Sequence, residues 1–189
     1  VDVPVCGGST KILIGPILTK QNVRKIRDRL CAIQERRRRL YAQGLLGHLL
    51  RPELFIRNID AVDATSCIDR MGELLAAQEL VTPEFIANVH LRENVSSTAF
   101  TDCLAIPHAI SVYPKRSFIA VVHNDAPIPW GRHDVRFVLL IGTAQEDMGL
   151  FRDVLDLIIE VFSSVETTMR LMQTDTFEEF LAAFTHDIG

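Results

Sequence analysis

His108 stands where an imidazole could accept a phosphoryl group. It follows Pro107 at the end of the apolar run Leu104–Ile106, and because proline favours an extended chain before it, the ring is expected where a strand ends abruptly. A neutral imidazole is nucleophilic near pH 7 when a hydrogen bond fixes its tautomer. A guanidinium can bind phosphate oxygens through two donors, and hydroxyls can supply further donors. The residues of those types just upstream are Arg92, Ser96, Ser97 and Thr98.

Other interpretations of the same residues stay open at this point. His108 could be an ordinary strand-end histidine bonded to a backbone carbonyl, and the hydroxyls could belong to a loop that ends a helix. Arg92 and Glu93 could be solvated helix-end charges. A hydrolytic triad of Ser97, Asp102 and His108 is disfavoured, because no Gly-x-Ser-x-Gly motif occurs and near neighbours in sequence seldom form a triad. For 123–125, His-Asn-Asp, no second His or Cys cluster completes a metal site.

A mixed set of helices and strands must position these groups. Thr82 as N-cap with Pro83 at the first helical position predicts a helix that reaches Arg92. Thr176 opens a capping box before a final helix through Phe184. Apolar periodicity predicts further helices at 68–75 and 150–162, and strands at 54–59, 103–106, 118–123 and 135–141. The fold class expected for residues 49–189 is α/β, a mixed sheet flanked by helices in three layers.

A long helix is expected before this domain. Thr19 is a plausible N-cap. Apolar residues then recur at alternating steps of three and four, interrupted only by Arg37, at Val23, Ile26, Leu30, Ile33 and Leu40. We expect a helical linker over 19–48, loosened by Gly44 and Gly47, whose stripe could also form the seam of a homodimer. The run 36–39, four arginines, is interpreted as a solvated helix face.

Composition restricts the class of protein. The 189 residues carry a formal net charge of -4, so no global basic field predicts direct nucleic-acid binding. Four cysteines show neither zinc-ligand spacing nor a disulfide framework, and no cofactor or metal is expected. No apolar run is long enough to enter a membrane and no signal pattern opens the chain, so a cytoplasmic location is expected. The start at Val1 without methionine suggests a piece of a longer protein.

Arg-Glu at 92–93, Ser-Thr at 97–98 and Ala-Ile-Pro-His at 105–108 together resemble the enzyme IIA domain, mannitol/fructose type, of the phosphoenolpyruvate-dependent sugar phosphotransferase system. The stretch 118–142 and the helices before Arg92 are similar too. The resemblance implies that His108 takes a phosphoryl group from the histidine carrier protein, that Arg92 supports it and that Ser97 and Thr98 are the motif's hydroxyl pair. A IIB component or IIB-like domain is the further partner that it implies.

The sequence Val-Pro-Val at 3–5, followed by Gly-Pro-Ile-Leu-Thr at 15–19, resembles the closing strand and helix of a IIB-like module. Residues 1–18 are therefore expected to be the tail of such a module. The order IIB-like then IIA-like is similar to the carboxy-terminal half of sugar-operon transcription activators with phosphotransferase regulation domains, in which the IIA-like module senses sugar supply. Transport-type members carry a second histidine after the central strand, whereas Met148, Gly149 and Leu150 occupy that region here. We therefore expect a regulatory domain. The alternatives are a transport component that relays phosphate to IIB and an unphosphorylated protein-interaction module.

Overall fold

The computed structural model describes residues 19–186, apart from the side chain of Arg38. The chain divides between Tyr41 and Ala42 into two compact units. The predicted IIB-like tail, residues 1–18, lies outside the described residues. Among the helices of residues 19–186, none combines the length and the apolarity needed to cross a bilayer.

The predicted long helix is present as α1, Lys20–Leu49. Thr19 caps it, because the Thr19 hydroxyl oxygen accepts a hydrogen bond from the amide of Asn22 at 3.2 Å. The expectation that Gly44 and Gly47 loosen the chain was wrong, since the helix continues through both. The cause is burial: Ala42, Leu46 and Leu49 pack into the hydrophobic core of the second unit and hold the last turns helical.

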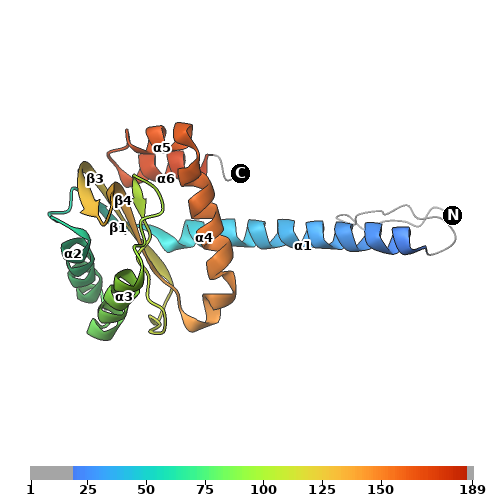
Figure 1. The fold of residues 1–189 in the computed structure, drawn as a ribbon, viewed down its shortest axis with the longest axis horizontal. Coiled ribbons are helices and arrows are strands. Elements are labelled where there is room, and N and C mark those ends of the chain that lie inside the picture. Colours follow the sequence, from blue (N-terminus) through green and yellow to red (C-terminus); the bar gives the residue numbers. More distant parts are fainter. Residues whose placement is uncertain (1–18, 187–189) are drawn as a thin grey trace. The chain divides into compact units, whose positions relative to one another are not determined.

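A four-stranded mixed sheet forms the centre of the second unit (Figure 1). Its strands are β1 (Leu50–Arg57), β2 (Leu104–Ala105), β3 (Phe118–Trp130) and β4 (His133–Gly142), in the spatial order β1-β3-β4-β2. Strands β3 and β4 pair antiparallel, while β1 with β3 and β2 with β4 pair parallel. The predicted apolar strand at 135–141 is therefore a central strand, covered on both faces.

Helices cover both faces of this sheet, as predicted. On one side lie α2 (Ala64–Ala77) and α3 (Pro83–Val95); on the other lie α4 (Met148–Ser163), α5 (Val165–Leu171) and α6 (Phe177–Thr185), with a 3-10 turn at Gln145–Asp147 before α4. The predicted caps are confirmed, because the side chains of Thr82 and Thr176 accept from the amides of Phe85 and Glu179.

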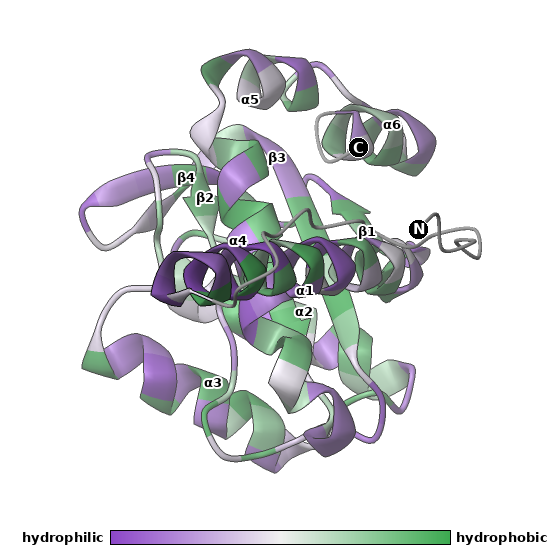
Figure 2. Ribbon diagram, turned by 90° about the vertical axis from the view of Figure 1, so that its right-hand side faces the viewer, coloured by the Kyte–Doolittle hydropathy of each residue, from purple (hydrophilic) through white to green (hydrophobic). Residues whose placement is uncertain are grey.

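Successive side chains of β3 point to opposite faces of the sheet and so contribute to two hydrophobic cores, one under each layer of helices. Phe118, Ala120 and Val122 face the cluster under α2 and α3, whereas Ile119 and Val121 face the cluster under α4 and α6. Figure 2 shows the corresponding apolar residues on the inner sides of the helices and along the strands. The sheet thus supplies both cores of a three-layer unit.

Three strands differ in length from the sequence-based expectation, and one helix was not predicted. Strand β1 begins at Leu50 and includes Pro52, which an edge strand tolerates because its outer side needs no amide donor. Strand β2 spans only two residues, and β3 runs on through the proline-containing stretch to Trp130, with a register shift after His123. Helix α5 was not predicted, since its seven residues are too few for a clear apolar period.

Candidate functional site

His108 lies at the end of the sheet, just beyond β2. Pro107 and Ile106 are buried, and the amide of Ile141 in β4 donates to the carbonyl of Pro107 at 3.0 Å. His108 forms an isolated parallel bridge with the same Ile141. The chain therefore continues the pairing of β2 along β4 up to the histidine and then leaves the sheet, which exposes part of the imidazole.

One hydrogen bond determines which ring nitrogen of His108 is nucleophilic. Its Nδ1 lies 2.8 Å from the carbonyl oxygen of Ile106. A carbonyl can only accept, so Nδ1 carries the proton and Nε2 keeps a lone pair in the neutral ring. Burial lowers the pKa of His108; the bond to Ile106 opposes this, and the positive charge of Arg92 lowers the pKa further. The neutral, nucleophilic form is thereby favoured at pH 7.

Arg92 lies in the last turn of α3, close enough to His108 to affect its pKa. Its Nη1 donates to the carbonyl of Ser96 at 2.8 Å, just past the end of the helix. A cation at a helix C-terminus also interacts favourably with the helix dipole. This bond orients the guanidinium beside the loop at 96–98. Among the described residues it is the hydrogen bond that Arg92 donates, so its other donors can bind an anion.

Glu93 connects three parts of the site, a role that sequence reasoning missed. Its carboxylate accepts hydrogen bonds from the amide and hydroxyl of Thr98 and, at 2.8 Å, from the indole nitrogen of Trp130. Thr98 and Trp130 are buried. The carbonyl of Thr98 in turn accepts from the amide of Ile106 at 3.0 Å. The solvated helix-end interpretation therefore fails for Glu93, which joins α3, the hydroxyl loop and β3 next to the chain that carries His108.

The two hydroxyls of the predicted cradle are placed differently. The hydroxyl of Thr98 donates to Glu93, so in this arrangement Thr98 supports the loop. Ser97 is exposed, and its hydroxyl oxygen accepts from the amide of Ala99 at 3.2 Å. Ser97 also lies against Gly131, which turns the β3–β4 hairpin with a φ of 66° that favours glycine.

Asn88 holds the segment that follows His108. Its side-chain oxygen accepts from the amides of Ile110 and Ser111, at 2.7 and 3.0 Å, and its side-chain nitrogen donates to the hydroxyl of Ser111. Both sides of the histidine are thus tied down. A single asparagine in the middle of a predicted helix gave no signal that could have identified this role.

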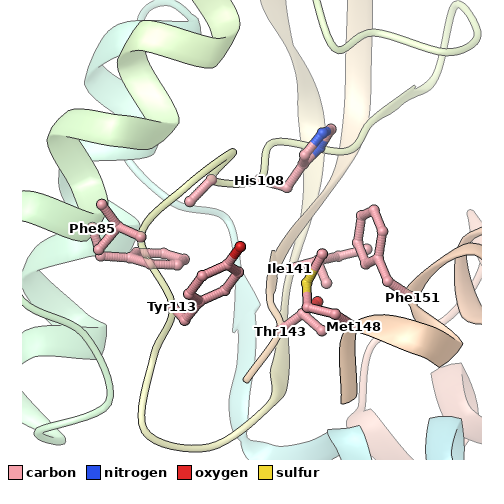
Figure 3. A pocket seen from close by; sticks show the side chains of 9 residues that line it. Phe85, His108, Tyr113, Ile141, Thr143, Met148 and Phe151 are labelled. Carbon is pink, nitrogen blue, oxygen red and sulfur yellow. The ribbon is translucent and has the colours of Figure 1, made fainter. Parts of the chain in front are cut away.

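A small, mainly apolar hollow that is open to solvent adjoins His108 (Figure 3). Met148 and Phe151 of α4 form one wall, and the ring centroids of Phe151 and His108 are 5.6 Å apart. Tyr113 and Phe85 line the opposite side in Figure 3, and the imidazole is turned away from Tyr113. The wall contributed by α4 is therefore apolar at the position where it meets the histidine.

The alternative sites considered from the sequence do not form. Asp102 pairs with His133 at 2.7 Å rather than with His108, so the triad that the sequence already disfavoured is incomplete. Within residues 19–186, no cluster of three or more His, Cys, Asp or Glu side chains could hold a metal ion. His123 is buried and stacks on Phe137, with ring centroids 4.3 Å apart.

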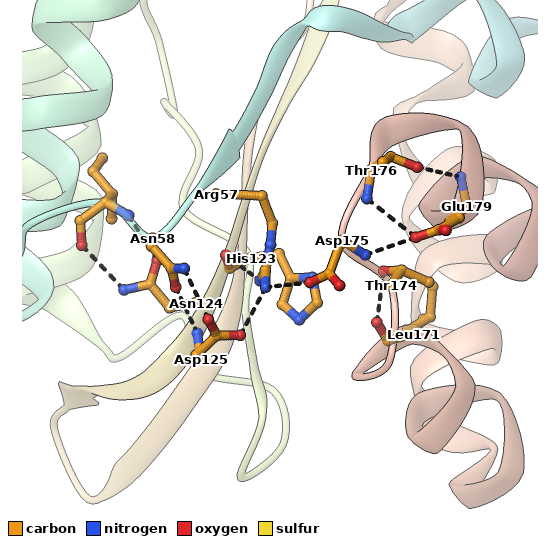
Figure 4. A network of polar contacts seen from close by, with 11 residues as sticks. Arg57, Asn58, His123, Asn124, Asp125, Leu171, Thr174, Asp175, Thr176 and Glu179 are labelled. Carbon is orange, nitrogen blue, oxygen red and sulfur yellow. Dashed lines mark hydrogen bonds and ion pairs between the residues drawn. The ribbon is translucent and has the colours of Figure 1, made fainter.

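The polar residues around His123 form a structural network (Figure 4). Arg57 at the end of β1 donates to the backbone carbonyl of His123 and forms ion pairs with Asp125, at 2.7 Å, and Asp175, at 3.0 Å. Asn58 adopts a φ of 54° and bonds the side chain of Asp125. These contacts join β1, β3 and the chain before α6.

A family model and several known proteins that match this chain belong to the same family. The family model for the phosphoenolpyruvate-dependent sugar phosphotransferase system, EIIA 2, matches residues 48–187. The mannitol-specific phosphotransferase enzyme IIA component of Halalkalibacterium halodurans is 29% identical over 138 residues, which are 71% of this chain and 92% of that protein. The transcriptional regulator ManR of Bacillus subtilis is 24% identical over 136 residues. These are 72% of this chain but only 21% of the regulator.

Solved structures share the fold. The nitrogen regulatory protein IIA-Ntr from Neisseria meningitidis matches with a TM-score of 0.68 at 20% identity, over 75% of this chain and 99% of its own. Enzyme IIA of mannitol in its complex with phosphorylated enzyme IIB from Escherichia coli matches with a TM-score of 0.64 at 17% identity. The match covers 72% of this chain and 97% of that one. At these identities the likeness shows the mixed sheet flanked by helices.

Proposed function

The chain belongs to the EIIA 2 family of the phosphoenolpyruvate-dependent sugar phosphotransferase system, and from this membership we propose that His108 accepts a phosphoryl group on Nε2. The observation that carries the proposal is the bond from Nδ1 to the carbonyl of Ile106, which leaves Nε2 as the free nucleophile. In the step, the nitrogen–phosphorus bond of a donor phosphohistidine breaks while the bond from phosphorus to Nε2 forms. Nδ1 keeps its proton, and the carbonyl of Ile106 stabilises the positive charge that the ring gains.

Three further groups assist the proposed acceptor. Arg92, close to His108, supplies the cation that binds the phosphoryl oxygens. Ser97 is the exposed hydroxyl donor on the neighbouring loop, and Thr98 holds that loop through Glu93. Because these groups are fixed before the phosphoryl group arrives, they need little reorganisation during transfer.

We propose the histidine carrier protein as the donor, with a IIB component or IIB-like domain as a second partner. Large apolar side chains are exposed on the elements that carry or adjoin the site, which suits docking of another protein around the histidine. They are Leu91, Val95, Phe100, Ile110, Tyr113 and Met148. The IIA structure from Escherichia coli that shares this fold is in complex with its phosphorylated IIB.

The role that we propose is regulatory: the domain senses sugar supply within a sugar-operon transcription activator. Two observations support this role. A curated relative, ManR, is a transcriptional regulator that this chain covers only in part. The α4 wall beside His108 consists of Met148 and Phe151, so it offers no second imidazole to assist onward transfer. A domain that holds charge tolerates this wall better than a relay does.

The second candidate is a transport component that passes phosphate to IIB. It is favoured by the 29% identity to a mannitol-specific IIA component, of which this chain covers 92%. The third candidate, an unphosphorylated interaction module, predicts that His108→Ala leaves partner binding unchanged. In each case the proposed organisation is a IIB-like tail over 1–18, a linker over 19–48 and the IIA-like domain over 49–189.

The test is intact mass after incubation with phosphoenolpyruvate, enzyme I and the histidine carrier protein. The wild-type chain should gain one acid-labile phosphoryl group, and His108→Ala should gain none. His133→Ala is the matched control, because His133 is also partly exposed but is paired with Asp102. Equal labelling of wild type and His108→Ala would overturn the proposed site, and no labelling of either would favour the interaction module.

A further inference from the structure

The first 22 residues of α1, from Lys20 to Tyr41, present an apolar stripe that remains accessible. Val23, Leu30 and Leu40 are 39%, 52% and 59% exposed. Ile26 and Ile33, on the same side of the helix, are partly exposed. Steps of three and four residues between these positions form a narrow seam with two positions per heptad, as in a coiled coil.

Positive charge borders this stripe on both sides. In the heptad that places Val23 and Leu30 at a and Ile26 and Ile33 at d, Arg27 occupies an e position while Arg29 and Arg36 occupy g positions. Residues 20–41 contain nine basic and two acidic residues, and both acids, Asp28 and Glu35, fall at f on the outer face. Thus, within residues 20–41, no carboxylate occupies a position next to the seam.

From this pattern we infer that α1 is a docking site for an acidic amphipathic helix, one with apolar a and d positions and carboxylates at e and g. Such a helix would bury the stripe and place its carboxylates beside Arg27, Arg29 and Arg36. Arg37 occupies the third a position, in the seam itself. A carboxylate opposite Arg37 would set the register of the two helices.

The same charges disfavour two other binding partners for the stripe, a second copy of α1 and a membrane surface. A second copy of α1 offers no acidic e or g position, and a parallel pair would bring Arg37 against Arg37 in the seam. A membrane surface is matched less well, because interfacial helices carry broader apolar faces with aromatic anchors, whereas this stripe has two positions per heptad and an arginine within it. The homodimer considered from the sequence is thus less favoured than a heterotypic pair.

The test measures binding of the chain, residues 1–189, to synthetic four-heptad peptides by isothermal titration calorimetry. The probe has Ile and Leu at a and d and Glu at every e and g, and its control has Lys at e and g. The glutamate peptide should bind, more weakly as salt is raised, and the lysine peptide should not. Arg29→Glu/Arg36→Glu should weaken glutamate-peptide binding by at least about tenfold and create binding to the lysine peptide.

A matched variant separates the seam from net charge. Arg24→Glu/Lys25→Glu makes the same change in charge at b and c positions, away from the stripe, and should keep the glutamate-peptide affinity within about threefold. Circular dichroism would verify that both variants remain folded. Equal weakening by the two variants, a dimeric mass without peptide, or binding only to anionic phosphatidylglycerol vesicles would each overturn the proposal. Labelling of His108 is expected to be unaffected in both variants.

Discussion

The protonation of His108 is the residue-scale quantity on which the proposed reaction depends. Burial and the charge of Arg92 both lower the pKa of His108, so we expect an NMR titration midpoint below the ordinary value of about 6.5. Arg92→Gln should raise this midpoint, because it removes a nearby positive charge, and should move the acid limb of the labelling rate to higher pH. Arg70→Gln, an exposed arginine on α2, is the control that should leave both unchanged. A midpoint unaffected by Arg92→Gln would contradict the proposed proximity.

The carboxylate of Glu93 should stabilise the site as well as the fold. Glu93→Ala leaves the buried Thr98 amide and the Trp130 indole without their acceptor, which should reduce the free energy of unfolding by about 1–3 kcal/mol. Denaturant unfolding measures the loss, and the fluorescence of the single tryptophan reports the change around Trp130. Glu73→Ala, at an exposed position on α2, is the matched control. We also expect slower labelling of His108, since the loop at 96–98 loses its anchor.

His123 should make the stability of the fold depend on pH. Burial is the largest cause that lowers the pKa of His123, to about 4, and among the described residues its Nδ1 contacts no hydrogen-bond partner. The unfolded chain takes up a proton below about pH 6.5 while the folded chain does not, so stability is lost as pH falls from about 6.5 toward 4. Between pH 7.5 and pH 5 the loss should be about 1–2 kcal/mol.

His123→Phe tests this assignment, because a phenyl ring can retain the stack on Phe137 without titrating. The variant should lose less stability between pH 7.5 and pH 5 than the wild type, as measured by denaturant unfolding at both values. An identical pH dependence would assign the acid sensitivity to other groups.

At the scale of the elements, glycines in α1 and β4 should respond in opposite ways to the same substitution. Gly44→Ala adds a methyl group that meets nothing within 4 Å, so it should stabilise the helix by about 0.5–1 kcal/mol. A Cβ at Gly142 would lie within van der Waals overlap of the Phe118 ring, so Gly142→Ala should destabilise by about 1–3 kcal/mol. Thermal unfolding of the two variants checks the signs, and destabilisation by Gly44→Ala would mean that α1 ends earlier.

Helix caps and apolar runs, which are visible in short stretches of sequence, correctly predicted several helices and strands. Thr82 and Thr176 cap the helices that their sequences indicate, and the apolar run of β4 is central because both its faces are buried. Features that depend on contacts between residues far apart in the sequence were not predicted. Gly44 stays helical because neighbouring residues of α1 pack into the hydrophobic core of the second unit, and β3 extends to Trp130 because it pairs with β4 in a hairpin. Within the candidate site, residue types made His108 and Arg92 candidates and the family resemblance then favoured them. The contacts of Glu93 could not be predicted, because they depend on the fold that brings Trp130 to it.

At the scale of the whole molecule, the question is whether the phosphoryl group stays on the chain or moves to another protein. We expect the phosphorylated chain to lose its group slowly to a mannitol-type IIB, because Phe151 and Met148 offer no proton donor or acceptor beside His108. Phe151→His would place an imidazole at a ring position 5.6 Å from His108 and should speed transfer by at least about tenfold.

Phe151→Leu is the control for this substitution, since it opens the same space without adding a titratable group, and transfer from it should stay slow. The assay follows radiolabelled phosphate from the isolated phosphorylated chain to IIB over time. Rapid transfer from the wild type would show that an apolar wall does not hinder donation, and the proposed sensor would then give way to the transport relay. Slow transfer in all three chains would instead place the barrier in docking, because an added imidazole can act only after IIB has bound.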